Sequence, residues 1–185
     1  MPRLFTGIEV PAAVAERLAG IRGGLPGARW IDPEDYHLTL RFIGDIDTVM
    51  ADAVAEGLAR VSRAGFALRL ADIGTLGTRK PRAIVARAEA SAPLVELQAQ
   101  HERIVQRAGL PPEGRKFTPH VTVARLRRVG VRAIAEYLAL RGGLFTGAFT
   151  VNRFVLFSSR DSVGGGPYVI EQAYPLEPQA ALAAE

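Results

Sequence analysis

Two copies of one four-residue pattern constrain this chain more than any other feature of its sequence. His37-Leu38-Thr39-Leu40 and His120-Val121-Thr122-Val123 both read His-apolar-Thr-apolar, and they begin 83 residues apart. The alternation has the two-residue period of a β-strand, so His and Thr share one face and the aliphatic residues share the other. Each copy therefore predicts a strand with a buried side and a polar side that carries an imidazole and a hydroxyl.

The size and composition of the chain indicate a globular protein. Its 185 residues and 48% apolar content are enough for one compact domain or two small lobes that share a core. No apolar run approaches the roughly 18 residues of a membrane-spanning helix, and the start, Met1 to Phe5, leads into strand-like sequence without a signal peptide. The absence of cysteine excludes disulfides and thiolate metal sites and fits a reducing compartment. We expect a cytoplasmic protein with no membrane partner.

The basic residues are almost all arginine. The net charge is +4, and only two of the 23 basic residues are lysine. Arginine recognises phosphate with a planar, two-pronged group that lysine lacks. Two basic groups occur, Arg79 to Arg82 and Arg125 to Arg128. We interpret the first as solvated surface, whereas the second directly follows a His-Thr pattern, which favours a phosphate-facing role.

Hydrophobic periodicity and breaker residues predict strands and helices in alternation. Strands are predicted at 4–10, 36–43, 66–73, 83–88, 117–124, 148–157 and 168–174, with a short extended segment at 28–31. Helices are predicted from Pro11 to about residue 22 and over 48–63, 91–108 and 131–140. This mixture favours an α+β fold with largely antiparallel sheets over a doubly wound parallel sheet. Both patterned strands follow a turn and precede a helix, so an old duplication with pseudo-twofold symmetry is a further hypothesis.

Two facing His-Thr strands would form a cleft suited to acid–base catalysis. An imidazole titrates near neutrality, so one ring can act as a base while the other, protonated, acts as an acid. Such a pair suits in-line attack at a phosphodiester, and the hydroxyls of Thr39 and Thr122 could donate to the non-bridging phosphate oxygens. The sequence has no carboxylate within the patterns and no His-x-x-x-His, so we expect neither a metal site nor a cofactor.

Other readings of the single residues stay open. A half-buried structural role is the alternative for His37 and His120, but their matched threonines disfavour it. His101 lies on the apolar stripe of a predicted helix without a matching threonine, and we interpret it as structural. Arg41 shares the face of His37 by parity, and either phosphate or solvent would suit it. Arg125 has the opposite parity to His120, so it needs a strand end or a β-bulge to face the site.

The chain resembles the two-histidine (2H) phosphoesterase superfamily. Within it, the chain is most similar to the bacterial and archaeal RNA 2′,3′-cyclic phosphodiesterase family, also called 2′-5′ RNA ligase. The resemblance runs almost from end to end. Besides the two patterns, it rests on the segments Arg3 to Pro11, Trp30 to Tyr36, Leu40 to Gly44, Phe117 to Leu126 and Phe154 to Arg160.

The resemblance implies a bilobal α+β fold. Two mainly antiparallel sheets would enclose a central cleft with helices on the outside, and residues 1–185 would form a single domain of two lobes with one pattern in each. It implies opening of a 2′,3′-cyclic phosphate to a 2′-phosphate without a metal. His37 would protonate the leaving 3′ oxygen, His120 would activate water, and Arg125 would contact the phosphate. The reverse reaction, with an RNA 5′-hydroxyl in place of water, would form a 2′-5′ linkage without ATP.

The expected partners are RNA ends or nucleoside 2′,3′-cyclic phosphates, bound by a monomer. One alternative is a 2H phosphodiesterase for a small cyclic nucleotide or an ADP-ribose cyclic phosphate, with the same chemistry. Another is a non-catalytic RNA-binding module that uses its arginines and stacks bases on Phe42 or Phe117. An RNA-binding module would not explain why two strands carry matched His and Thr residues. It would also keep its RNA affinity after both histidines were replaced.

Overall fold

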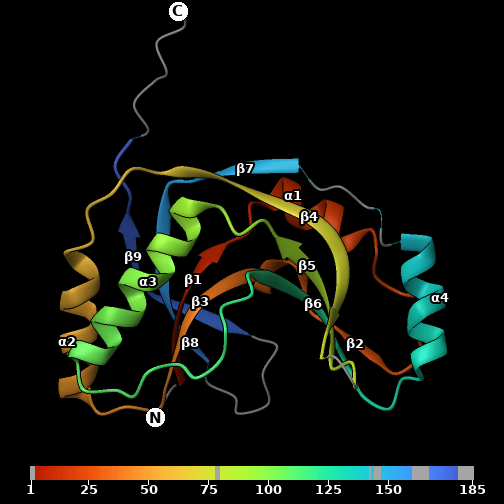
Figure 1. Cartoon of the computed structure of the whole chain (residues 1–185), viewed down its shortest axis with the longest axis horizontal. Coiled ribbons are helices and arrows are strands. Elements are labelled where there is room, and N and C mark those ends of the chain that lie inside the picture. The colour runs from red at the N-terminus through yellow and green to blue at the C-terminus, as the bar shows by residue number, and fades with distance from the viewer. Residues whose placement is uncertain (1–2, 78–79, 142, 144–146, 160–166, 179–185) are drawn as a thin grey trace, which may run out of the picture.

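The fold is α+β, as predicted (Figure 1). The computed structural model describes residues 3–77, 80–141, 143, 147–159 and 167–178. Its elements are, in order, β1 (Arg3–Glu9), α1 (Ala12–Ala19), β2 (Ala28–Trp30), a 3₁₀ turn η1 (Pro33–Asp35), β3 (His37–Gly44), α2 (Thr48–Ala59), β4 (Phe66–Leu76), β5 (Ala83–Ala88), α3 (Ala92–Arg107), β6 (His120–Leu126), α4 (Val131–Arg141), β7 (Gly147–Val151), β8 (Arg153–Ser159) and β9 (Tyr168–Pro175). Apart from shifted ends, one predicted element differs from this order.

The nine strands of the described residues form one continuous sheet. Its order is β7-β4-β5-β6-β3-β1-β8-β9, and β2 pairs separately with β6. These strands pair in antiparallel fashion, as predicted. Two halves, β7-β4-β5-β6 and β3-β1-β8-β9, meet where β3 pairs with β6 through Leu38 and Val121. The two predicted sheets are therefore joined at one register pair, and each half supplies one patterned strand.

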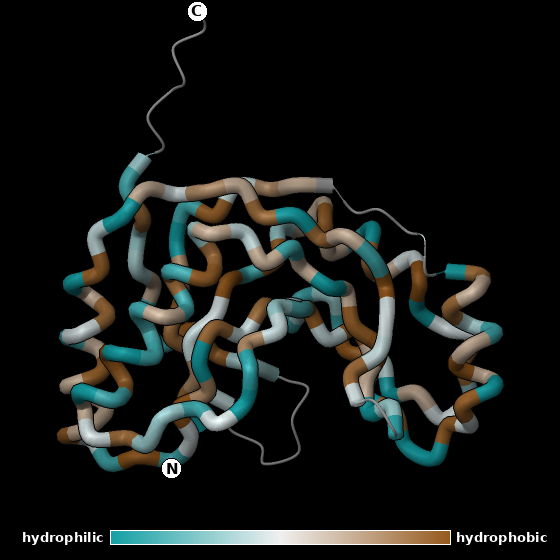
Figure 2. The backbone as a smooth tube through the Cα atoms, in the orientation of Figure 1, coloured by the Kyte–Doolittle hydropathy of each residue, from teal (hydrophilic) through white to brown (hydrophobic). Residues whose placement is uncertain are grey.

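The single strand predicted over 148–157 is wrong. The chain is divided at Asn152 into β7, which pairs with β4, and β8, which pairs with β1 on the far side of the sheet. Because one residue separates the two strands, the sheet must curve until these two regions meet. The backbone accordingly forms an arch (Figure 2). Alternation along 148–157 is compatible with both strands, so it does not reveal where the partner changes.

The helices cover the outside of the arch, and the core lies beneath them. α2 and α3 lie together over one half and α4 lies over the other (Figure 1). The aliphatic residues of the two patterns are at most 3% exposed and belong to this core: Leu38, Leu40, Val121 and Val123. No helix within the described ranges is long and apolar enough to cross a membrane. The buried side of both patterned strands is thus where the alternation predicts it.

Candidate active site

The two patterned strands meet at the middle of their patterns. Leu38 and Val121, the second residue of each pattern, are register partners in antiparallel strands. The neighbouring positions of an antiparallel pair run in opposite directions, so His37 comes level with Thr122 and Thr39 level with His120. Because the two aliphatic side chains point into the core, the four polar side chains share the opposite face. Antiparallel pairing thus brings both histidines and both threonines to one surface.

A β-bulge follows the pattern in β3. Thr39 pairs with Gly7 of β1, whereas Arg41 pairs with the adjacent Thr6, so Leu40 is an extra residue in β3. Residues on either side of such an insertion no longer alternate regularly. Leu40 and Arg41 are consequently buried one after the other, and the exposed residue after them is Phe42. Counting alternate residues from His37 therefore assigns the wrong face to the residues after Leu40.

Arg41 does not face the histidines, and the prediction that it shares their face is wrong. Its guanidinium forms an ion pair with Glu102 of α3 and donates to the carbonyl oxygens of Phe42 and, at 2.7 Å, Pro111. The Arg41 side chain is only 7% exposed. Glu102 also accepts a hydrogen bond of 3.0 Å from the backbone N–H of Glu113. Arg41 ties β3 to α3 and to the segment that follows it, and its donors are occupied.

A second bulge, in β6, exposes the arginine that follows it, whereas the bulge in β3 buries Arg41. Thr122 pairs with Val85 of β5 and Ala124 pairs with the adjacent Ile84, so Val123 is the extra residue. Val123 and Ala124 are both buried, and Arg125 is exposed. The bulge that the sequence requires for Arg125 to face the site is present. Its charge accordingly acts on both imidazoles.

Both histidines are held by the carbonyl group two residues before them. His37 Nδ1 lies 2.8 Å from the carbonyl oxygen of Asp35, and His120 Nδ1 lies 2.7 Å from that of Thr118. A carbonyl oxygen only accepts hydrogen bonds, so Nδ1 carries the hydrogen in both rings and donates it. The other nitrogen, Nε2, is left to accept or release a proton. The two rings are thus prepared for acid–base chemistry in the same way.

Three aromatic rings, Phe5, Phe157 and Tyr168, form a box around His37. Their centroids lie 5.0, 5.3 and 4.7 Å from the centroid of the imidazole, respectively. The backbone N–H of Tyr168 donates to Asp35 Oδ1 at 3.2 Å. Asp35 therefore connects the start of β9 to the turn whose carbonyl orients His37. The sequence contains no periodic signal for this aromatic box, because its members come from three strands that are distant in the chain.

The surroundings lower the pKa of both imidazoles. The pKa of His37 falls to about 4, chiefly because burial disfavours the charged ring. The hydrogen bond to Asp35 opposes this shift, while the charges of Arg125 and His120 add to it. The pKa of His120 is also lowered, first by burial and then by Arg125, against the hydrogen bond to Thr118. In the free protein both rings are therefore neutral at pH 7.

The shared face opens into a cleft of about 840 Å³. This volume lies within the range of pockets that bind small molecules. A smaller hollow of about 270 Å³ adjoins it and has Phe42, Arg115 and His120 among the residues that both contain. Six of the seven residues singled out from the sequence line the cleft, Arg41 being the exception: His37, Thr39, Phe42, His120, Thr122 and Arg125.

The cleft also contains basic residues that the sequence analysis assigned elsewhere or missed. Lys80 and Arg82 are exposed, as the interpretation of the basic group Arg79 to Arg82 as solvated surface predicts, but they also line the cleft. Arg79 lies outside the described residues. Arg115 lines the cleft as well and forms an ion pair of 3.0 Å with Glu113. These residues precede β5 and β6, and only the pairing of those strands brings them to one place.

His101 lies in the core, as its interpretation as a structural residue requires. Its side chain has no exposed surface, and Nδ1 lies 2.8 Å from the hydroxyl oxygen of Thr6, with which it shares a hydrogen bond. The ring of Phe154 packs edge-on against it at 4.5 Å between centroids. Burial lowers the pKa of His101 to about 3, and the charge of Arg63 acts in the same direction. His101 does not line the cleft.

The cleft offers few ligands for a metal ion. With no cysteine in the chain, histidine and carboxylate side chains are the donors to consider. Asp35 is the one carboxylate among the described lining residues, and its Oδ1 accepts the hydrogen bond from Tyr168. No group of three or more His, Cys, Asp or Glu in the described part of the chain could hold a metal ion. The residues of the cleft are equipped for proton transfer and anion binding.

Comparison with known proteins finds relatives of both the doubled pattern and the fold. The family model described as "LigT like Phosphoesterase" matches the chain twice, over residues 8–86 and 85–168. Each match contains one of the two His-Thr patterns, which supports the duplication hypothesis. The crystal structure of Escherichia coli LigT complexed with 3′-AMP has the same fold, with a TM-score of 0.76 at 24% identity. That alignment covers 95% of this chain and 99% of the other.

Two curated relatives carry the name RNA 2′,3′-cyclic phosphodiesterase. The protein from Aquifex aeolicus is 30% identical over 153 residues, which cover 79% of this chain and 81% of the relative. The protein from Aeropyrum pernix is 30% identical over 151 residues, which cover 77% and 85%. One of these relatives is bacterial and the other archaeal, and both align over most of their length.

Proposed function

Because the chain belongs to the LigT-like phosphoesterase family, we propose that it hydrolyses 2′,3′-cyclic phosphates at RNA ends to 2′-phosphates, with His37 and His120 as acid and base. The observation that carries the proposal is the pairing of Leu38 with Val121, which presents both histidines and both threonines on one face of the cleft. The RNA 2′,3′-cyclic phosphodiesterase name of the curated relatives supports the choice of substrate.

In the proposed step, water attacks phosphorus as the bond to the 3′ oxygen breaks. Nε2 of His120 takes the proton of the attacking water, and Nε2 of His37 gives its proton to the leaving 3′ oxygen. The product carries a 2′-phosphate and a free 3′-hydroxyl, and proton exchange with solvent restores both rings. With an RNA 5′-hydroxyl as the nucleophile in place of water, the same attack breaks the bond to the 3′ oxygen and forms a 2′-5′ linkage without ATP.

The other polar groups would stabilise the phosphate. The hydroxyls of Thr39 and Thr122 donate to the non-bridging oxygens, where negative charge accumulates in the transition state. Arg125 pairs with the same phosphate through charge-assisted hydrogen bonds. Phe42, which is 43% exposed within the cleft, offers its ring to a nucleobase.

The low pKa of His37 is compatible with the role of acid only when substrate is bound. A phosphate anion in the cleft favours a charged imidazole and pairs with Arg125, whose charge otherwise lowers the pKa of His37. Substrate binding thus raises the pKa of His37 and loads it with the proton that the leaving oxygen needs. His120, free of the aromatic box, remains the base.

The product of an RNA oligonucleotide ending in a 2′,3′-cyclic phosphate tests this function. We expect a 2′-phosphate end, formed at the same rate with and without EDTA. A predominantly 3′-phosphate product would contradict the assignment of acid and base. Loss of activity in EDTA with recovery on adding a divalent ion would contradict the metal-independent step. A module that only binds RNA would give no product and would bind equally well after both histidines were replaced.

A further inference from the structure

The positive charge of the cleft exceeds what one cyclic phosphate needs. Among the described residues, four basic side chains line it, against the single carboxylate of Asp35. Arg115 is already paired with Glu113. The other three, Lys80, Arg82 and Arg125, have no carboxylate partner among the described residues. A cyclic phosphodiester carries one negative charge, which Arg125 alone can balance, so Lys80 and Arg82 remain as surplus cations.

Two hydrogen bonds fix the backbone of Arg82 beside the end of β6 that is farthest from His120. The backbone N–H of Arg82 donates to the carbonyl oxygen of Leu76, and its own carbonyl oxygen accepts from the N–H of Leu126, both at 2.8 Å. The next residue, Ala83, is the register partner of Arg125. At about 3.3 Å per strand residue, the backbone of Arg82 lies roughly 15 Å along β6 from that of His120. This distance suits a second negative charge of the ligand better than the phosphate between the histidines.

The backbone of Lys80 lies close to that of Gly77, the residue just past the end of β4. Gly77 has a φ of +96°, and a Cβ at this position would lie 2.4 Å from the carbonyl oxygen of Lys80. Glycine at position 77 therefore allows this close approach to Lys80. Lys80 and Arg82 thus line the same cleft as Arg125.

We propose that Lys80 and Arg82 form a second phosphate subsite, which binds the backbone of RNA on the 5′ side of the reacting end. The inference rests on the proposed function, because a 2′,3′-cyclic phosphate occupies the 3′ end and the chain continues only in the 5′ direction. Each further nucleotide brings one negative charge. The subsite therefore selects oligonucleotides over cyclic mononucleotides, and over other small cyclic phosphates that carry no neighbouring phosphodiester.

The test compares kcat/KM for a cyclic mononucleotide with that for an RNA hexamer ending in a 2′,3′-cyclic phosphate. We expect the wild-type protein to prefer the hexamer, and the ratio of the two values to fall about ten- to a hundredfold in the Lys80→Gln/Arg82→Gln variant. Each lost phosphate contact lowers the slope of log affinity against log salt by about 0.7 for a single strand. The hexamer slope should therefore fall by about 1.4, as measured by the anisotropy of a labelled hexamer with a 2′-phosphate end.

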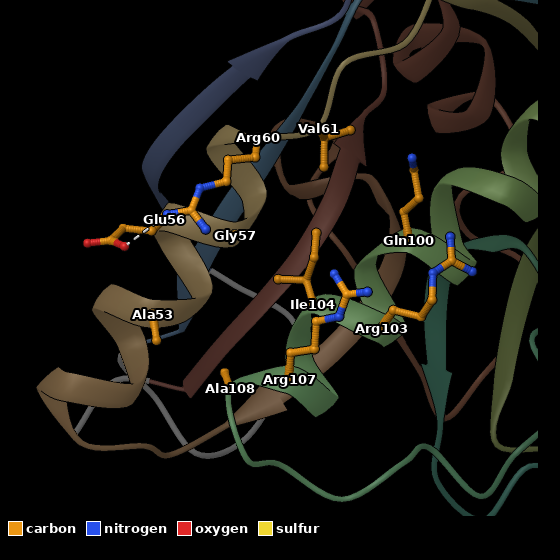
Figure 3. Close-up of a pocket in the computed structure, with 10 residues that line it drawn as sticks. All are labelled: Ala53, Glu56, Gly57, Arg60, Val61, Gln100, Arg103, Ile104, Arg107 and Ala108. Carbon is orange, nitrogen blue, oxygen red and sulfur yellow. Dashed lines mark hydrogen bonds and ion pairs between the residues drawn. The ribbon is translucent and has the colours of Figure 1, made fainter.

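Arg103→Gln/Arg107→Gln is the matched control, because it also removes two positive charges. Arg103 and Arg107 line a separate groove of about 460 Å³ between α2 and α3, which shares no described lining residue with the cleft (Figure 3). This variant should keep the wild-type preference and salt slope. The control removes the same charge from the protein without touching the cleft, so it separates a local contact from an effect of net charge.

The outcomes separate the subsite from the proposed function. A wild-type protein that hydrolyses both substrates without preferring the hexamer would overturn the subsite and leave the function intact. The same holds if the Lys80→Gln/Arg82→Gln variant keeps the preference, or if Arg103→Gln/Arg107→Gln reduces it equally. A protein that hydrolyses neither substrate contradicts the function, and the salt slope of hexamer binding then decides the subsite alone.

Discussion

Phe42 and Arg125 occupy equivalent positions in the two patterned strands. Each is the fifth residue after its histidine, and each follows one β-bulge that turns it to the polar face. Both patterned strands thus have one bulge after the pattern, and they differ in the side chain that follows it. One half offers an aromatic ring and the other a guanidinium, which suits a ligand with a base on one side and a phosphate on the other.

Replacing Arg125 with Ala should lower kcat/KM about ten- to a hundredfold on any cyclic phosphate substrate. The loss is that of one charge-assisted contact, on the order of 1.5–3 kcal/mol. Steady-state kinetics and circular dichroism of the variant would check it. Arg41→Met is the contrasting variant, since it leaves Glu102 without its partner and should cost about 3 kcal/mol of unfolding free energy. Unchanged kinetics for Arg125→Ala would exclude the proposed phosphate contact.

Replacing Phe42 with Ala should raise KM and change kcat little. Stacking of a base on an aromatic ring contributes about 1–3 kcal/mol, so a five- to hundredfold increase in KM is expected. A cyclic phosphate without a nucleobase should show no such increase, and the comparison of the two substrates is the measurement. Equal losses on both substrates would mean that Phe42 supports the cleft and does not contact the base.

The histidines should act as a unit. His37→Ala and His120→Ala should each lower kcat about 10²- to 10⁴-fold, and the double variant should be little worse than the poorer single variant. A nitrophenyl phosphodiester has a leaving group that needs no protonation. On this substrate His37→Ala should recover much of its activity and His120→Ala should not. Rescue of His120→Ala in place of His37→Ala would reverse the two roles.

The aromatic box should control the pKa of His37. Replacing Phe157 with Leu removes one of the rings that exclude water, so the pKa should rise from about 4 toward the ordinary value near 6.5. NMR titration of the imidazole in the free protein measures this shift directly. Phe154→Leu is the matched control, because its ring packs on His101 and belongs to the core. A pKa of His37 that moves equally in both variants would argue against a specific effect of the box.

Mild acid should destabilise the protein through its buried histidines. The folded-state pKa is about 4 for His37 and about 3 for His101, both below the ordinary value near 6.5 of an unfolded chain. As the pH falls below 6.5, the unfolded chain therefore binds protons that the folded protein does not. The unfolding free energy should decrease by up to about 1.4 kcal/mol per pH unit for each such histidine.

Urea unfolding between pH 7 and pH 5 measures this dependence. His101→Gln should reduce the slope by the share of one histidine and leave the pH profile of kcat unchanged, because His101 lies away from the cleft. A stability that is constant over this range would show that the buried rings take up protons in the folded state. A changed pH profile of kcat would contradict the structural role of His101.

Local pattern was enough to predict which side chains each patterned strand presents on its two faces. The spacing within His37 to Leu40 and within His120 to Val123 places the polar and aliphatic side chains on opposite sides, because alternation is a property of any extended chain. The buried aliphatic residues and the shared polar face agree with that prediction. The α+β class and antiparallel pairing also follow from the order of short elements along the chain.

Register and curvature were decided only by the tertiary structure. Parity predicts the polar face for Arg41 and the core face for Arg125, and the structure has the reverse. Each bulge is an insertion relative to the neighbouring strand, and the sequence of one strand does not contain the register of its partner. Asn152 separates β7 from β8 because the curved sheet brings two distant strands to that point. Lys80 and Arg82 reach the cleft through the same strand pairing, and the rings around His37 gather across several strands. Sequence alone determines which face a residue takes within a regular strand, while pairing between strands determines which residues meet.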